Sequence, residues 1–261
     1  MITISVVIPA LNDSEMLERA LTDLAAQTRP ADEVIVVDNG SIDDTAAVAH
    51  SHHVRVLTEP VTGIFAASAT GYDAAKGEII ARLDADSRPP AEWLARIEGH
   101  FDSDSTVGVV TGPGVFYGGN PVVSALGRAL YIGGYFWSMK IWLGHPPIFG
   151  SNFAMRKSVW LSARERVHRT VPRIHDDLDL AMHLDPAAVV IYDKELVVGI
   201  SARPFATWTG FGRRIGWAFR TLAVNYPEVS PWRRRDDRRH EGKTAPHTAA
   251  GSTQLGKTKH S

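Results

Sequence analysis

Short apolar runs alternate with helix-like segments from the start of the chain. Ile4 to Ile8 is an apolar, β-branched run that ends at Pro9. Residues 14–27 then place apolar side chains at the spacing of a helix, with Ser14 in position to cap it. The pattern predicts a strand followed by a helix.

The alternation continues through the next sixty residues. Val34 to Val37 forms a second apolar run that ends in the turn sequence 38–41, and two aspartates can open a helix to about residue 50. A strand, an alanine-rich helix and a further strand are then predicted at 54–57, 63–75 and 78–83. This order predicts an α/β fold with a doubly wound, mostly parallel mixed sheet and helices on both faces.

In a sheet of this kind, ligands bind outside the carboxyl ends of the strands, where the strand order reverses. Pro9, Asp38 and Asp84 each lie at such an end. A chain of 261 residues with this architecture commonly forms a single domain. We therefore expect one domain over 1–230, with a nucleotide-binding half at 1–100 and an acceptor-side half at 101–230.

Two later segments are apolar enough to raise the question of a membrane. Residues 116–149 are rich in aromatic side chains, but their most apolar run, 129–139, is shorter than the roughly 20 residues of a membrane-spanning helix. Phe211, Ile215 and Phe219 form a stripe next to arginines, which suits the headgroup region of an anionic membrane. Core packing of the first segment and contact with a membrane surface both stay open.

Composition narrows the class of protein. Hydrophobic residues make up 44% and charged residues 22%, as in ordinary soluble globular proteins. The absence of cysteine excludes disulfides and thiolate chemistry and fits a reducing, cytoplasmic compartment. No positively charged leader precedes Pro9, so we expect no secretory signal.

The charge is concentrated near the end of the chain. Residues 231–261 hold eight Lys/Arg and three Asp/Glu, a net charge of +5, whereas the preceding residues carry a net charge of −6. This polar tail has few apolar groups with which to offset its ordering entropy, so we expect it to be disordered. We expect no nucleic-acid partner. The surface that the basic tail could bind is the inner face of an anionic membrane.

The sequence Asp84-Ala85-Asp86 places two carboxylates directly after an apolar strand. Carboxylate oxygens suit Mg²⁺ or Mn²⁺, which can hold a nucleotide diphosphate and neutralise charge on it. An isolated Asp-x-Asp is most often a solvated turn. Here it follows Val6-Val7-Ile8-Pro9-Ala10-Leu11-Asn12 and Val36-Val37-Asp38-Asn39-Gly40-Ser41, and precedes Gly150-Ser151-Asn152-Phe153 and Asp176-Asp177-Leu178.

These ordered motifs resemble the inverting glycosyltransferase family 2, which has the GT-A fold. The resemblance implies a metal-dependent enzyme that moves a sugar from a nucleotide diphosphate, usually of uridine, to an acceptor hydroxyl. It implies that the nucleotide is bordered by Pro9, Ala10, Asn12, Asp38 and Asp84, and that Asp86, with Asp84, binds the metal. Asp177 corresponds to the catalytic base, Asp176 stands beside it in place of a glutamate, and Gly150, Ser151 and Asn152 lie on the acceptor side.

Two positions depart from the pattern of the family. Ser68 and Ala69 replace an arginine and an asparagine, which puts the affinity for the donor and its identity in question. Arg82 could compensate by contacting phosphate, or it could be an ordinary surface arginine. For His175, His183 and Arg203 we prefer ordinary helix-flanking or surface roles over contacts with the metal or diphosphate.

Two other functions compete with this interpretation. A nucleotidyltransferase also combines a doubly wound sheet with aspartate-bound metal, but it normally has a glycine-rich loop where this chain has Pro9 to Asp13. A degenerate, non-catalytic binding subunit would explain Ser68 and Ala69 but not the retained aspartates. The sugar, the acceptor, the linkage and the oligomeric state cannot be derived from the sequence.

Overall fold

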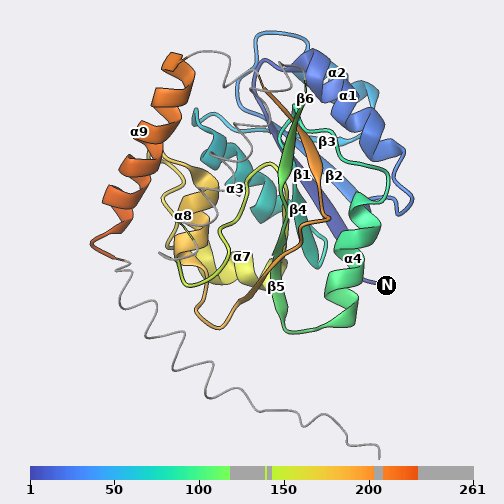
Figure 1. Ribbon diagram of the computed structural model, residues 1–261. Coiled ribbons are helices and arrows are strands. Elements are labelled where there is room, and N and C mark those ends of the chain that lie inside the picture. Colours follow the sequence, from blue (N-terminus) through green and yellow to red (C-terminus); the bar gives the residue numbers. More distant parts are fainter. Residues whose placement is uncertain (118–138, 140–142, 203–207, 229–261) are drawn as a thin grey trace, which may run out of the picture.

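The computed structural model of the chain describes residues 1–117, 139, 143–202 and 208–228. A seven-stranded sheet with the order β3-β2-β1-β4-β7-β5-β8 forms its centre (Figure 1). Its strands are β1 (Ile4–Ala10), β2 (Glu33–Asp38), β3 (Arg55–Thr58), β4 (Ile79–Arg82), β5 (Val107–Thr111), β7 (Phe153–Arg156) and β8 (Val189–Tyr192). β7 runs antiparallel to β4 and β5, and the other neighbouring strands pair in parallel. The predicted mostly parallel mixed sheet is confirmed.

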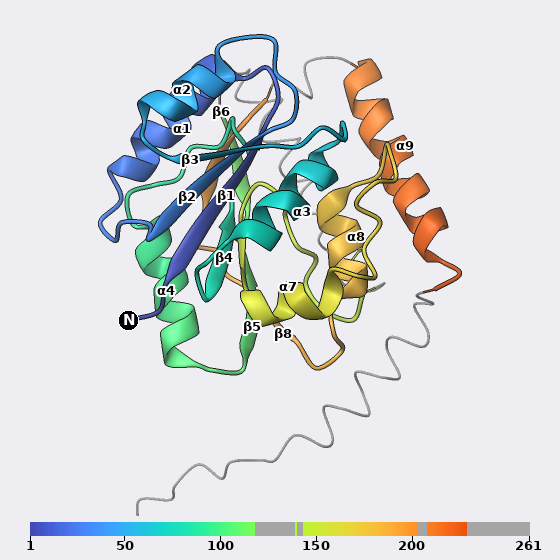
Figure 2. The same cartoon turned by 180° about the vertical axis from the view of Figure 1, so that it is seen from behind.

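Helices cover both faces of the sheet (Figures 1 and 2). One face carries α1 (Ser14–Ala25), α2 (Thr45–Ser51) and α4 (Trp93–Ser103). The other carries α3 (Ile64–Ala74), α7 (Lys157–Ala163) and α8 (Asp176–His183), and α9 (Trp208–Asn225) packs on α8. The predicted two-layer covering of a single α/β domain is therefore present.

The central strands β1, β4 and β5 are buried at every residue, which explains why they consist mostly of apolar residues. In β1, Ile4, Val6 and Ile8 pack beneath α1 and α4, whereas Val7 points to the opposite core beneath α3. This alternation follows from the two-residue period of a strand, and a strand that is covered on both sides favours apolar residues on both faces.

A second, two-stranded parallel sheet lies beside the main one. It pairs β6 (Gly114–Tyr117) with β9 (Val198–Ser201), and the sequence pattern did not predict it as a separate sheet. Each strand has four residues and its partner lies more than eighty residues away in the chain, so local periodicity carries no information on the pairing.

The start of the first helix differs from the expectation. The prediction that Ser14 caps α1 is wrong: Ser14 is the first residue of the helix, Asp13 is the N-cap residue, and no side chain caps the end. The backbone N–H of Ser14 instead donates to Asp43 Oδ2, 3.1 Å away in the next loop. The helix is thus tied to a neighbouring segment instead of being closed by its own cap.

The strand order reverses between β1 and β4, since β1 continues through β2 to one edge and β4 leads to the other. Ligands of doubly wound sheets bind at such a point, outside the carboxyl ends of the strands. Of the described helices, none is both long enough and apolar enough to span a bilayer.

Several predictions fall outside the described residues. They concern most of the aromatic segment (118–138 and 140–142), Arg203, and the expected disorder of 231–261. The boundary between domain and tail near residue 230 likewise stays a prediction.

Candidate functional site

The loops after β1 and β2 are tied to each other at the carboxyl end of the sheet. Asn12, whose φ is +53°, accepts the backbone N–H of Ile42 at 2.8 Å through Oδ1. Asp38 accepts the N–H of Ser41 at 3.0 Å. Pro9 and Ala10 pair with Val37 and Asp38 across the two strands. The structure thus brings together four of the residues expected to border the nucleotide, and their contact with a nucleotide stays a prediction.

Asn39 organises the loop that leads into α3, a role that sequence reasoning missed. Its Nδ2 donates to the carbonyls of Glu59 and Val61, both at 2.8 Å, and its Oδ1 accepts the N–H of Gly63 at 2.7 Å. Gly63 has φ of +150°, a conformation that side chains with a Cβ rarely adopt. The sequence indicated only an asparagine in the turn directly after an apolar run.

Arg82, the last residue of β4, is the central cation of the site. Its side chain is only 1% exposed, so it is not the surface arginine that the sequence left open. Nη2 donates to Asp84 Oδ1 at 2.7 Å, and Nη1 lies 3.0 Å from Asp176 Oδ2, at ion-pair distance but outside hydrogen-bond geometry. Burial lowers the pKa of Arg82, but Asp176 and Asp84 outweigh it, so the pKa is raised and the guanidinium stays charged.

Asp176 is buried at the start of α8 and shares its Oδ2 between two partners. The Ser68 hydroxyl lies 3.4 Å from this oxygen, which is also the one that Arg82 contacts. Burial raises the pKa of Asp176; Arg82 opposes the shift, and the nearby charges of Asp177 and Asp84 add to it. The family pattern has an arginine where this chain has Ser68. Here Ser68 and Arg82, the last residue of β4, contact the same oxygen of Asp176.

The turn at Gly150 and Ser151 joins two of the acids. Asp177 Oδ2 accepts the N–H of Gly150 at 2.9 Å, and Asp84 Oδ2 accepts the Ser151 hydroxyl at 2.5 Å. A Cβ on Gly150 would lie 2.5 Å from Arg82 Nη1, so only glycine permits this approach. Two carboxylates that are far apart in the chain therefore meet at neighbouring residues of one turn.

Asn152 holds this turn from inside the protein. Its side chain is fully buried, with Oδ1 accepting Trp93 Nε1–H at 2.9 Å and Nδ2 donating to the carbonyls of Pro113 and Leu196. The side chain of Asn152 is therefore hydrogen-bonded to α4 and to the segments just before β6 and β9. Of the three acceptor-side candidates, Gly150 and Ser151 are the two that face the acids.

The loop that carries Asp86 is held by the small sheet. The Asp86 carbonyl accepts the Tyr117 hydroxyl at 2.6 Å. Two residues later, the backbone of Arg88 exchanges hydrogen bonds with Gly199, at 2.8 and 2.9 Å. The Asp86 side chain itself is half-buried. β6 and β9 therefore fix the backbone of the Asp-x-Asp segment.

The donor set at the end of β4 fits a hard divalent cation. Asp84 and Asp86 offer only carboxylate oxygens, which suit Mg²⁺ or Mn²⁺. Asp84 uses one oxygen for Arg82 and the other for Ser151, and Asp86 stays the expected principal ligand. A carboxylate has further lone pairs, so Asp84 can still join the coordination. With Asp176 and Asp177 nearby, the described acids of the site outnumber its described cation, Arg82.

Tyr72 is a further residue of the site that sequence reasoning missed. Its buried ring packs edge-on against Trp160 at 5.0 Å and Phe153 at 6.4 Å. Burial raises the pKa of its hydroxyl, although the charge of Arg82 and a hydrogen bond with Ser68 oppose the shift. Tyr72 follows Ser68 by four residues on α3, so the shared helical face was the available indication.

Comparison with known proteins places these motifs in a family. Residues 5–161 match the family model described as glycosyl transferase family 2. Glycosyltransferase AglE of Haloferax volcanii is 36% identical over 126 residues, which cover 45% of this chain and 38% of that protein. An undecaprenyl-phosphate 4-deoxy-4-formamido-L-arabinose transferase of Aeromonas hydrophila is 38% identical over 104 residues, 36% of this chain and 32% of its own length. The matched part thus spans less than half of each relative.

The fold resembles that of solved structures. Glucosyl-3-phosphoglycerate synthase of Mycobacterium tuberculosis, in complex with Mn²⁺, uridine diphosphate and phosphoglyceric acid, superposes with a TM-score of 0.61 at 22% identity. The match covers 85% of this chain and 78% of that one. At this identity the likeness concerns the fold alone.

Proposed function

Since the chain belongs to glycosyl transferase family 2, we propose that it moves a sugar from a nucleotide diphosphate, a UDP-sugar, to an acceptor hydroxyl with inversion. The observation that carries this proposal is the meeting of Asp84 and Asp177 at the Gly150–Ser151 turn, around the buried Arg82. An acid after β4 and an acid on α8 thereby face one position at the end of the sheet.

Asp177 is the base of the proposed reaction. Its Oδ2 is held by the N–H of Gly150 and its Oδ1 by the N–H of Leu178, at 2.9 and 2.8 Å, which fixes the direction of the carboxylate. An acceptor hydroxyl loses its proton to a remaining lone pair of Asp177 as its oxygen bonds to the anomeric carbon. The bond from that carbon to the diphosphate breaks on the opposite side, and the electron pair leaves with the diphosphate.

Asp86, together with Asp84, would hold Mg²⁺ or Mn²⁺, which neutralises negative charge on the leaving diphosphate when bound. Arg82 keeps Asp84 and Asp176 in place from beneath, because its side chain is buried and contacts both. Pro9, Ala10, Asn12 and Asp38 would border the nucleotide, with Asp38 hydrogen-bonded to the base.

The acceptor in this proposal is lipid-linked or otherwise membrane-borne, and the enzyme acts at the cytoplasmic face. The Aeromonas hydrophila relative is named for undecaprenyl phosphate. On α9, Phe219 is 69% exposed and Ile215 is 39% exposed, and Arg213 stacks over Trp217 at 5.7 Å. Exposed apolar side chains next to arginines favour the headgroup region of an anionic membrane.

Sedimentation with vesicles tests the membrane part of the proposal. The chain should sediment with anionic vesicles at low salt and less so at high salt, because the basic groups are screened. Phe219→Ser should weaken the binding, whereas Leu161→Ser, an exposed apolar position on α7, serves as the matched control. Absence of binding to anionic vesicles at both salt concentrations would remove this part.

The catalytic part is tested by separating donor binding from turnover. UDP-sugars with Mn²⁺ should raise the melting temperature of the wild type and of Asp177→Asn alike, since a ligand that binds only the folded chain stabilises it. UDP release in the presence of an undecaprenyl-diphosphate-linked sugar, which offers a free sugar hydroxyl as acceptor, should fall by about 10²–10⁴-fold in Asp177→Asn, the usual contribution of a general base. Asp102→Asn, an exposed residue of α4, is the matched control.

Two outcomes contradict the proposal. Turnover of Asp177→Asn at the wild-type rate removes Asp177 as the base. Donor binding without turnover in the wild type favours the competing interpretation, a non-catalytic nucleotide-sugar-binding subunit.

A further inference from the structure

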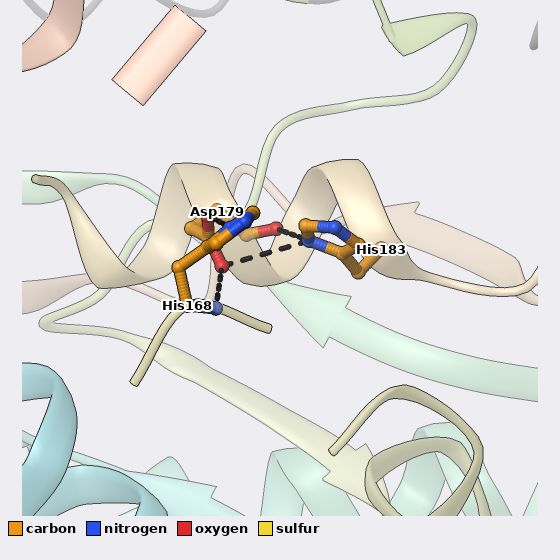
Figure 3. Close-up of side chains that lie close together, drawn as sticks. All are labelled: His168, Asp179 and His183. Carbon is orange, nitrogen blue, oxygen red and sulfur yellow. Dashed lines mark hydrogen bonds and ion pairs between the residues drawn. The ribbon is translucent and has the colours of Figure 1, made fainter. Parts of the chain in front are cut away.

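A second cluster of potential metal ligands extends along α8 from Asp179, in its first turn, to His183, its last residue. His168, from the loop after α7, meets Asp179 and His183, which are one turn apart on α8 (Figure 3). One candidate ligand atom from each residue lies within 4.8 Å of the others. Asp177 and His183 are separated by about 9 Å along the helix axis at the usual rise per residue. His183 is therefore remote from the acids at the start of α8, and Asp179, which follows them in the first turn, directs its carboxylate to His168 and Asn225.

Asp179 orients both imidazoles. Its Oδ1 lies 2.9 Å from His168 Nδ1, and its backbone carbonyl lies 2.9 Å from His183 Nδ1 (Figure 3). A carbonyl only accepts, so Nδ1 of His183 carries a proton, and in the neutral ring its Nε2 presents a lone pair. Asn225 of α9 donates to the same carboxylate at 2.8 Å, which fixes Asp179 in turn.

The Nε2 atom of His183 is buried and has no hydrogen-bond partner. The side chain is only 2% exposed, so water does not readily reach this atom. A buried acceptor without a partner destabilises a folded protein, and native structures rarely keep one without a function. A hydrogen-bonded His–Asp cluster explains the Nδ1 contacts but leaves Nε2 of His183 without a hydrogen bond.

Glu228, just beyond α9, faces both histidines. Its carboxylate oxygens lie 3.8 Å from His183 Nε2 and 3.9 Å from His168 Nε2, too far for hydrogen bonds. Two ligands of a tetrahedral Zn²⁺ lie about 3.3 Å apart at the usual bond lengths. The Glu228 side chain is 58% exposed, so a small rotation brings its oxygens within that separation.

We propose that His168 and His183, through Nε2, and Glu228 bind Zn²⁺, with Asp179 as the positioning residue that holds the two rings. Imidazole and carboxylate are the usual protein ligands of this ion, and a carboxylate that accepts the other ring N–H commonly orients a histidine ligand. The ion joins the loop after α7, α8 and the end of α9. It therefore fastens α9 against the helix that begins with Asp176 and Asp177.

α9 already meets the start of α8 through His175. The N–H of His175 donates to the Thr221 hydroxyl at 2.8 Å, and its Nε2 lies 2.9 Å from the carbonyl of Arg214. With Zn²⁺ bound at His183, α9 is held to α8 at both ends of that helix, near His175 and near His183. The proposed function does not use this ion, so the two proposals stand or fall separately.

Calorimetric titration of Zn²⁺ into the EDTA-treated full chain, with excess Mg²⁺ present to occupy oxygen-only sites, tests the proposal. The wild type and Asp86→Ala should each bind one Zn²⁺ that raises the melting temperature. His183→Gln should lose this site, and His52→Gln, a histidine beside α2, should keep it. Tetrahedral Co²⁺ absorption should follow the same pattern.

Two further variants keep the test decisive if His183→Gln does not fold. His168→Gln changes a loop residue and Glu228→Gln an exposed one, and each should weaken Zn²⁺ binding by about tenfold or more. A wild type that binds no Zn²⁺ overturns the proposal and leaves a hydrogen-bonded cluster. Equal Zn²⁺ binding by wild type, His168→Gln and Glu228→Gln overturns it too, as does loss of the ion in Asp86→Ala alone.

Discussion

Arg82 holds the charges of the candidate site together at the scale of single residues. Its side chain is 1% exposed and pairs with both Asp84 and Asp176, so each acid would lose a positively charged partner without it. The sequence showed the Asp-x-Asp and the two later aspartates, but the role of Arg82 depends on a partner 94 positions further along the chain. An isolated arginine at a strand end gives no local indication of such a partner.

Replacing Arg82 tests this arrangement. Arg82→Met should destabilise the protein by roughly 3–5 kcal/mol at pH 7, because Asp176 is left as a buried charge without its partner. The double variant Arg82→Met/Asp176→Asn should recover part of the loss, since the uncompensated charge is gone. Urea unfolding measures both values. A stability of Arg82→Met equal to that of the wild type would show that the pair is unimportant.

Gly150 has a separate effect on the site. A Cβ there meets Arg82 Nη1 at 2.5 Å and Asp177 Oδ2 at 3.1 Å, so Gly150→Ala should displace the base and the cation together. We expect loss of UDP release with a smaller change in melting temperature, since the turn lies at the end of the sheet. Full activity of Gly150→Ala would mean that the turn can shift without cost.

At the scale of elements, the close contact of α3 with the sheet depends on Gly71. A Cβ at this position would lie 2.3 Å from Val7 Cγ1 and 3.0 Å from Val37 Cγ2, both in the buried core. Gly71→Ala should destabilise the fold by about 1–3 kcal/mol, the usual cost of an overpacked core.

Gly99 on α4 is the matched control for Gly71, because a Cβ there meets nothing within 4 Å. Gly99→Ala should be neutral or stabilising by up to about 1 kcal/mol, since alanine favours a helix. Chemical unfolding compares the two variants. Equal effects of both substitutions would contradict the packing of α3 on β1 and β2.

The elements differ in how far the sequence could predict them. β1 to β4 and α1 to α3 follow from apolar runs and helical spacing, because both patterns are local properties of the sequence. The pairing of β6 with β9 and the antiparallel insertion of β7 depend on residues far apart. The same reason hid the engagement of Asn152, whose three partners come from α4 and two distant loops.

At the scale of the whole molecule, Asp193 ties the turn after β8 to α4. Its carboxylate accepts hydrogen bonds from Arg96 at 2.5 and 2.9 Å and lies 2.8 Å from His100 Nε2. Burial raises the pKa of Asp193, but the hydrogen bonds from Arg96 and His100 outweigh it, so the pKa lies below its ordinary value. The ionised form is thus favoured in the folded state.

The lowered pKa of Asp193 predicts how stability depends on pH. Its contribution is present above the unfolded pKa of about 3.9 and is lost as the pH falls through the lower folded value. Asp193→Ala should cost roughly 1–3 kcal/mol at pH 7, and the difference from the wild type should narrow below about pH 4. Urea midpoints from pH 7 to pH 3 check this, with Asp102→Ala as control. A difference that stays constant to pH 3 would contradict a stabilising role of the ionised Asp193 carboxylate.

Titration of UDP into the wild-type chain, with Mn²⁺ and then with EDTA, tests the central claim most directly, because it needs no acceptor. The site at the ends of β1, β2 and β4 predicts binding at a single position that requires the metal. Asp86→Ala in Mn²⁺ should behave like the wild type in EDTA. If UDP fails to bind in Mn²⁺, or binds equally with and without the metal, the acids after β4 do not form a metal-dependent nucleotide site.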